Sequence, residues 1–67
     1  MYFKRIGDLR QDHDLTQQQV ADLLSCKREV YRRYEKGTRE IPVSYAIKLA
    51  EHYNVTLDYL LNISDQK

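Results

Sequence analysis

Apolar residues recur every three or four positions along most of this 67-residue chain, and this spacing constrains the fold more than any other feature. It predicts short helices over residues 2–12, 17–24, 28–36, 43–53 and 57–62. In the fourth of these segments the expected buried stripe consists of Val43, Ala46, Ile47, Ala50 and Tyr53. No segment alternates apolar and polar residues over the length of a strand, apart from short fragments. The sequence therefore predicts an all-α fold, a compact bundle of five helices.

The length of the chain allows one domain, residues 1–67, and leaves little room for both a core and an enclosed substrate pocket. We therefore expect no enzyme, and the sequence has neither a nucleophile–base pair nor a glycine-rich phosphate loop. The one cysteine, Cys26, lacks zinc-site spacing with His13 and His52, so no metal or cofactor is expected. The apolar runs are too short for a membrane span or a signal peptide, which predicts a cytoplasmic protein.

Residues that favour helix ends mark several of these segments. Thr16 and Gln19 have the spacing of a capping box at the start of the second helix, and Thr56 can cap the last helix. Gly37 follows the third segment, where a left-handed residue commonly ends a helix. Only Ser25 to Lys27 separate the second helix from the third. Two short helices joined by such a turn form a helix-turn-helix, although many helical hairpins look similar.

The charge of the chain is unevenly distributed. Eleven Lys and Arg and ten Asp and Glu leave a net charge of +1, yet six of the eleven cations lie between residues 27 and 39. Because this window contains only two acids, Glu29 and Glu35, its net charge is +4 and that of the remaining chain is −3. A charged stretch is most often a solvated helix surface, so the charge by itself does not identify a partner.

The third predicted helix combines an apolar face with a contiguous polar stripe. The stripe contains four cations and one acid: Arg28, Glu29, Arg32, Arg33 and Lys36. A helix about 10–12 Å wide fits the major groove of B-DNA, where arginine binds guanine through two hydrogen bonds. Glu29 can accept a hydrogen bond from cytosine, or it can pair with Arg32 or Arg33 on its own helix, and the sequence leaves both open.

Three segments of the chain together resemble one known family. They are Thr16–Leu24 (TQQQVADLL), Tyr31–Gly37 (YRRYEKG) and Val55–Leu61 (VTLDYLL). They are similar to the phage repressor and Cro-type helix-turn-helix proteins, also called the XRE family, and the resemblance extends over residues 6–61. It implies a five-helix, lambda-repressor-like DNA-binding domain in which the third helix enters the major groove.

The resemblance also implies roles for particular residues. Gln17 matches a glutamine that contacts a phosphate or a base edge and can brace the third helix. Arg10 and Glu35 match a pair that links the first and third helices and orients the third helix, which is the reader helix of the family. The base contacts implied are Gln17, Arg28, Glu29, Arg32 and Arg33. The DNA-backbone contacts implied are Gln17, Lys27, Lys36, Thr38 and Arg39.

Two residues depart from the family pattern, and both bear on how the third helix enters the groove. Ser25 stands where the turn usually begins with glycine, and a left-handed serine is strained by about 1 kcal/mol. Lys27 stands where the third helix is usually capped by Ser or Thr, and such a side-chain cap contributes about 0.5–2 kcal/mol.

The function implied is that of a sequence-specific transcriptional regulator that binds double-stranded DNA, most often a repressor. We expect a homodimer on an inverted-repeat operator. Tyr53, Tyr59 and Ile63 are candidate dimer contacts, or they equally close the core of the monomer. Two alternatives stay open. One is the antitoxin of a toxin–antitoxin pair, which would also bind a toxin. The other is a protein-interaction module that keeps the fold without reading DNA.

Overall fold

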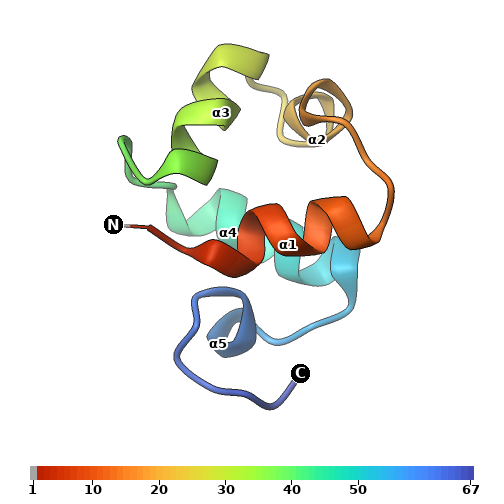
Figure 1. The fold of residues 1–67 in the computed structure, drawn as a ribbon, viewed down its shortest axis with the longest axis vertical. Coiled ribbons are helices and arrows are strands. Elements are labelled where there is room, and N and C mark those ends of the chain that lie inside the picture. The colour runs from red at the N-terminus through yellow and green to blue at the C-terminus, as the bar shows by residue number, and fades with distance from the viewer. Residues whose placement is uncertain (1) are drawn as a thin grey trace.

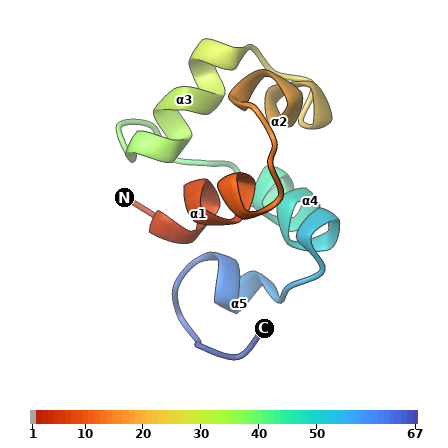
Figure 2. The ribbon, with the colours of Figure 1, turned by 45° about the vertical axis from the view of Figure 1, so that its right-hand side comes forward.

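The computed structural model describes residues 2–67, which form five helices and no strand. They are α1 (Lys4–Asp12), α2 (Gln17–Leu23), α3 (Arg28–Lys36), α4 (Val43–Tyr53) and α5 (Leu57–Leu60). Helices α2 and α3 pack together at one end of the molecule, α1 and α4 form the middle, and α5 and the C-terminal residues form the opposite end (Figures 1 and 2). The predicted all-α, five-helix architecture is confirmed.

The core receives apolar side chains from every helix. The fully buried side chain of largest volume is that of Tyr31 on α3, which therefore anchors this helix to the rest of the bundle. Within residues 2–67 the buried hydrophobic residues are Ile6, Leu9, Val20, Ala21, Leu24, Tyr31, Tyr34, Ala46, Leu49, Ala50, Tyr53 and Leu60.

Each helix is followed, one or two residues after its last residue, by a residue in the left-handed conformation. These residues are Asp14, Ser25, Gly37, Asn54 and Asn62, with φ between 55° and 77°. In every case the next backbone N–H donates to the carbonyl five residues back, at 2.8–3.1 Å, as in a Schellman motif. Glycine, asparagine and aspartate adopt this conformation more readily than serine, so Ser25 is the strained member of the set.

The predicted caps at the helix starts are confirmed. The Gln19 N–H donates to Thr16 Oγ1 at 3.1 Å, and the Thr16 N–H donates to Gln19 Oε1 at 2.8 Å, which completes the capping box of α2. Thr56 Oγ1 accepts from the Tyr59 N–H at 3.0 Å at the start of α5. Lys27 precedes α3 without a side-chain cap.

Three helix bounds differ from the prediction. The first helix begins at Lys4 instead of residue 2, because Phe3 is extended and Tyr2, which is 62% exposed, lies outside the helix. The second helix ends at Leu23, one residue earlier than predicted. The last helix ends at Leu60 instead of residue 62, because Asn62 turns left-handed.

The prediction of which α4 residues are buried was partly wrong. Val43 is 66% exposed and Ile47 is 43% exposed, whereas Leu49 is buried. On a helix with 3.6 residues per turn, Ala46, Leu49 and Ala50 lie on one narrow face, and Val43 and Ile47 lie at its edge. Neighbouring helices cover only the narrow face, so these two side chains stay at the surface.

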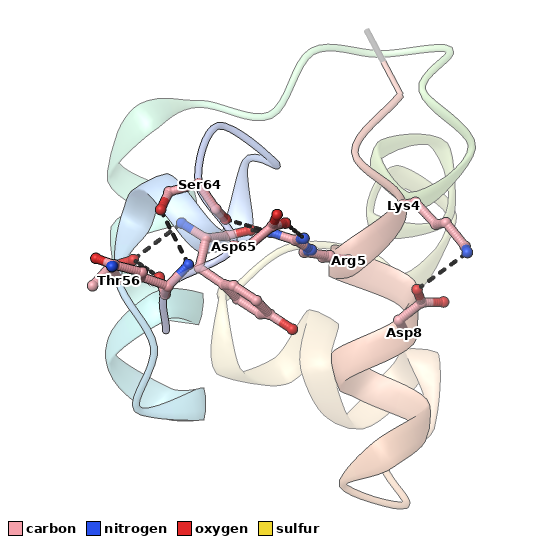
Figure 3. Close-up of polar contacts among 8 residues, drawn as sticks. Lys4, Arg5, Asp8, Thr56, Ser64 and Asp65 are labelled. Atoms are coloured by element: carbon pink, nitrogen blue, oxygen red, sulfur yellow. Dashed lines mark hydrogen bonds and ion pairs between the residues drawn. The ribbon is translucent and has the colours of Figure 1, made fainter.

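Arg5 attaches the C-terminal residues to α1 (Figure 3). Its guanidinium donates to the carbonyl oxygens of Tyr59 at 3.0 Å and Ser64 at 2.6 Å, and to the Asp65 carboxylate at 2.7 Å. It also stacks over the Tyr59 ring, 4.0 Å from the centroid. One partly buried cation therefore holds the residues after α5 against the first helix.

Candidate nucleic-acid interface

Helix α3 presents its charged stripe away from the core. Tyr31 and Tyr34 are buried, whereas Arg28, Glu29 and Arg33 are exposed. Lys36 is also exposed, and Arg32 is partly buried. Helix α3 lies at the end of the molecule opposite α5 (Figure 1), and four of the five stripe residues are exposed. The five residues predicted to share one face do so.

The turn before α3 sets the direction of that helix. Ser25 adopts the left-handed conformation with φ of 57°, as its position in the turn suggested. The following Cys26 N–H donates to the Ala21 carbonyl at 2.9 Å and closes the end of α2. Cys26 itself is half-buried, and burial raises the pKa of its thiol. The turn is therefore tightly bonded in spite of the missing glycine.

Arg10 of α1 and Glu35 of α3 form the expected pair. Arg10 Nε donates to Glu35 Oε2 at 2.5 Å, and Arg10 Nη1 donates to the Leu15 carbonyl at 2.7 Å. Both side chains are largely buried, with 14% and 12% exposed. The hydrogen bond to Glu35 raises the pKa of Arg10, so this residue stays charged. The pair joins α1, the turn after it and α3.

Gln17, the first residue of α2, also reaches Glu35. Its Nε2 donates to Glu35 Oε1 at 3.3 Å, a long hydrogen bond. The glutamine therefore braces α3 in this structure, which is one of the two roles implied for it. Glu35 Oε1 also receives a long contact from Arg10 Nη2, at 3.4 Å.

Glu29 pairs with Arg32 on the same helix. Arg32 Nη2 donates to Glu29 Oε1 at 2.9 Å, and Arg32 Nε donates to the same oxygen at 3.2 Å. This hydrogen bond is the main reason why the pKa of Glu29 lies below its ordinary value, so Glu29 is ionised at neutral pH. Within residues 2–67, Arg28, Arg33 and Lys36 form no ion pair, so their charges are available to a polyanion.

The segments flanking α3 are exposed and basic. Lys27 precedes the helix and Arg39 lies in the loop after it, and both side chains are exposed. Thr38 Oγ1 donates to the Arg33 carbonyl at 3.4 Å and so closes the C-terminal turn of α3. Three of the predicted backbone-contacting residues, Lys27, Thr38 and Arg39, therefore border the stripe at its two ends.

Sequence analysis missed two buried hydroxyl groups beside the Arg10–Glu35 pair. Tyr31 and Tyr53 have phenol oxygens that are buried and have no hydrogen-bond partner among the described residues. Burial raises the pKa of Tyr31, and the adjacent Glu35 carboxylate raises it further. Burial raises the pKa of Tyr53 to about 12. The spacing of Tyr31 and Glu35, one helical turn apart, is the signal that could have revealed their contact.

A groove of about 270 Å³ is lined mainly by apolar residues, among them Phe3, Ile41, Val43, Leu57 and Leu61. No group of three or more His, Cys, Asp or Glu side chains in residues 2–67 is arranged to hold a metal ion. No helix in that range has the length and apolar character needed to cross a membrane.

The packed pair α2 and α3, with its tight turn and outward cationic stripe, defines a helix-turn-helix domain. The chain belongs to the helix-turn-helix family, whose model matches residues 6–60. The resemblance to phage repressors is also confirmed, because one of the relatives is a phage repressor.

The curated relatives are longer than this chain. It is 34% identical over 65 residues to YobD, an uncharacterized HTH-type transcriptional regulator of Bacillus subtilis, covering 97% of this chain and 58% of the relative. It is 35% identical to RstR, a cryptic phage CTXphi transcriptional repressor of Vibrio cholerae, covering 97% of this chain and 59% of the relative. It is 33% identical to AnsR, an HTH-type transcriptional regulator of Bacillus subtilis, covering 100% of this chain and 58% of the relative. No solved structure gives a significant match.

Proposed function

We propose that this chain is the DNA-binding domain of a transcriptional repressor and that α3 reads the major groove of double-stranded DNA. The observation that carries the proposal is the outward stripe of α3, on which Arg28, Arg33 and Lys36 have no anionic partner within residues 2–67. Unpaired cations on a rigid helix attract phosphates and can donate to base edges. The relatives named as transcriptional regulators and as a repressor support the same function.

The proposed base-contacting residues of α3 differ in whether their side chains are already paired within the protein. Arg28 and Arg33 can bind guanine directly. Glu29 and Arg32 must first exchange the bond that joins them for bonds to bases. Because an exposed ion pair contributes little free energy, this exchange costs little. An acid on the stripe also repels phosphate, which disfavours binding to the DNA backbone alone.

The proposed DNA-backbone contacts lie on the stripe or beside it. They are Gln17, Lys27, Lys36, Thr38 and Arg39. Phosphate contacts of this kind fix the register of the protein on the duplex, while the base contacts choose the sequence. The pair Arg10–Glu35 is proposed to hold the reader at the angle that these contacts require.

We further propose a homodimer on an inverted-repeat operator, in the cytoplasm and without catalytic activity. Two half-sites one helical turn apart need two reader helices in fixed relation. Of the candidate dimer contacts, Tyr53 is buried in the monomer and Tyr59 lies under Arg5, whereas Ile63 is 71% exposed. Val43 and Ile47 add exposed apolar surface on α4, so a second copy would cover these side chains. No observation favours a toxin or another protein as partner.

The proposal is tested by selecting binding sites from random duplex DNA and then measuring the affinity of variants. Arg33→Ala and Arg28→Ala should each relax the preference at one base pair by about 1–3 kcal/mol. Arg39→Ala should weaken binding to all sequences alike and reduce the salt dependence by about one counterion. Lys67→Ala removes a cation at the opposite end of the molecule and should change neither quantity. If Arg33→Ala and Arg28→Ala weaken all sequences equally, α3 does not read bases.

A further inference from the structure

Tyr2 lies against the turn that ends α3. A Cβ added to Gly37 would be 2.7 Å from the Tyr2 Cα, 2.9 Å from the Tyr2 Cβ and 3.0 Å from the Tyr2 amide nitrogen. Such distances are too short for a real Cβ, so the absence of a side chain at Gly37 is what leaves room for Tyr2. The start of the described chain lies beside the loop after α3 in both views (Figures 1 and 2). The backbone of Tyr2 is therefore placed at the C-terminal end of α3.

This place adjoins the proposed DNA-binding surface. Residues four apart on a helix share a face, so Gly37 follows Arg33, a proposed base contact, on one side of α3. Thr38 and Arg39, two of the proposed DNA-backbone contacts, come directly after Gly37. The N–H and the hydroxyl of Thr38 both donate to the Arg33 carbonyl, at 3.1 and 3.4 Å, so this loop is bonded to α3. Tyr2 is thus a neighbour of residues that are proposed to contact the DNA backbone.

The side chain of Tyr2 is available to a ligand. It is 62% exposed, whereas Tyr31, Tyr34 and Tyr53 are buried in the core. A phenol hydroxyl donates a hydrogen bond without carrying a charge, and tyrosine is one of the side chains that bind DNA phosphates. Because the backbone of Tyr2 is already held against Gly37, less freedom is lost on binding than at an unattached chain end.

We propose that Tyr2 is a further DNA-backbone contact, whose hydroxyl donates to a phosphate on the strand that Thr38 and Arg39 contact. This inference rests on the proposed function, because it requires DNA beside α3. Gly37 then has two roles, since it ends α3 in the left-handed conformation and also admits Tyr2 to the DNA-binding surface. Phosphate contacts from two segments far apart in the chain would fix the register of the protein on the duplex more firmly than the loop alone.

The first arm of the test measures affinity for duplex DNA. Tyr2→Phe removes only the hydroxyl, and it should weaken binding about five-fold for every duplex sequence, since a phosphate contact does not read bases. The salt dependence should stay as in the parent protein, because a neutral donor releases no counterion, in contrast to Arg39→Ala. Tyr53→Phe is the matched control, because it removes a buried hydroxyl that cannot contact DNA, and it should change affinity less than two-fold.

The second arm tests whether the close approach to Gly37 places the Tyr2 hydroxyl. Asparagine adopts the left-handed conformation readily, so Gly37→Asn retains the turn, but its Cβ would collide with Tyr2 and displace it. In this background Tyr2→Phe should weaken binding less than two-fold. Urea unfolding of Tyr2→Phe should match that of the parent protein, because the hydroxyl is proposed to act on DNA and not on the fold.

The outcomes distinguish this inference from the proposed function on which it rests. A parent protein that binds duplex DNA, with a Tyr2→Phe variant that binds equally well, would overturn the inference alone. A parent protein that binds no duplex DNA would overturn both. An equal loss of affinity from Tyr2→Phe with and without Gly37→Asn would show that Gly37 does not place the hydroxyl, and a matching loss of stability would show a structural role. Either result would also overturn the inference.

Discussion

Replacing Ser25 with glycine should stabilise this domain. Ser25 has φ of 57° in the turn between α2 and α3, and its side chain is exposed, so the substitution removes strain without opening a cavity. A left-handed conformation is unfavourable for an ordinary residue by about 1–2 kcal/mol. Glycine gains about 0.4–1 kcal/mol of extra freedom in the unfolded chain, which opposes the benefit. The expected net gain is about 0.5–1 kcal/mol, or about 2–8 °C in Tm for a domain of this size.

The same measurement contains its own controls. Asn54 has the same φ of 57° at the end of α4, but asparagine tolerates this conformation, so Asn54→Gly should give a smaller gain or none. Gly37→Ala should act in the opposite direction, because φ is 77° and the added Cβ would lie 2.7 Å from the Tyr2 Cα. Urea and thermal unfolding followed by circular dichroism provide all three values. A Ser25→Gly variant that is no more stable than the parent, or that gains only as much as Asn54→Gly, would refute the strain argument.

Three further predictions concern the polar contacts. Glu35→Gln leaves Arg10 charged and largely buried without its anion, so we expect a loss of about 2–3 kcal/mol in urea unfolding, whereas Glu29→Gln, in an exposed pair, should leave stability unchanged. Equal effects of these two variants would mean that burial does not set the strength of the pair. Arg5→Ala removes three hydrogen bonds, one to Tyr59 of α5 and two to residues 64 and 65, so amide exchange at residues 64–66 should accelerate while α3 keeps its protection. Unchanged exchange there would show that Arg5 does not hold this segment. Because burial raises the pKa of Tyr53 from 10.0 to about 12, unfolding releases its proton between those values. Stability should then be unaffected by this group below pH 10 and fall above it, by up to about 1.4 kcal/mol per pH unit, and Tyr53→Phe should reduce that slope. A slope that Tyr53→Phe leaves unchanged would contradict the burial of this phenol.

Local patterns in the sequence were sufficient to locate the helices and the charged stripe. The capping box of Thr16 and Gln19 and the left-handed Gly37 join residues that are close in the chain, so their geometry follows from the sequence. The stripe of α3 likewise depends only on helical periodicity. The first helix lacked such a marker, since Phe3 caps it without a side-chain hydrogen bond, and its start was predicted two residues too early.

The roles of the individual site residues could be predicted only in part. The pairing of Arg10 with Glu35 was implied by family resemblance, and the structure contains it. The choice of Arg32 over Arg33 as the partner of Glu29 depended on side-chain conformations that spacing leaves open. The unpartnered state of the Tyr31 hydroxyl was not predictable, because it depends on every group packed around it from other helices.

The sequence by itself determined the five helices, the turn between the second and third, and the cationic stripe, because each depends on residues within a few positions of one another. Only the tertiary structure decided which apolar residues of α4 stay exposed and how Gln17 and Arg10 share the carboxylate of Glu35. It also decided that Arg5 bonds to Tyr59, Ser64 and Asp65, which follow it in the chain by 54, 59 and 60 positions. Burial and hydrogen bonding depend on which residues, distant in the sequence, come into contact when the helices pack. Helical periodicity contains no information about these tertiary contacts.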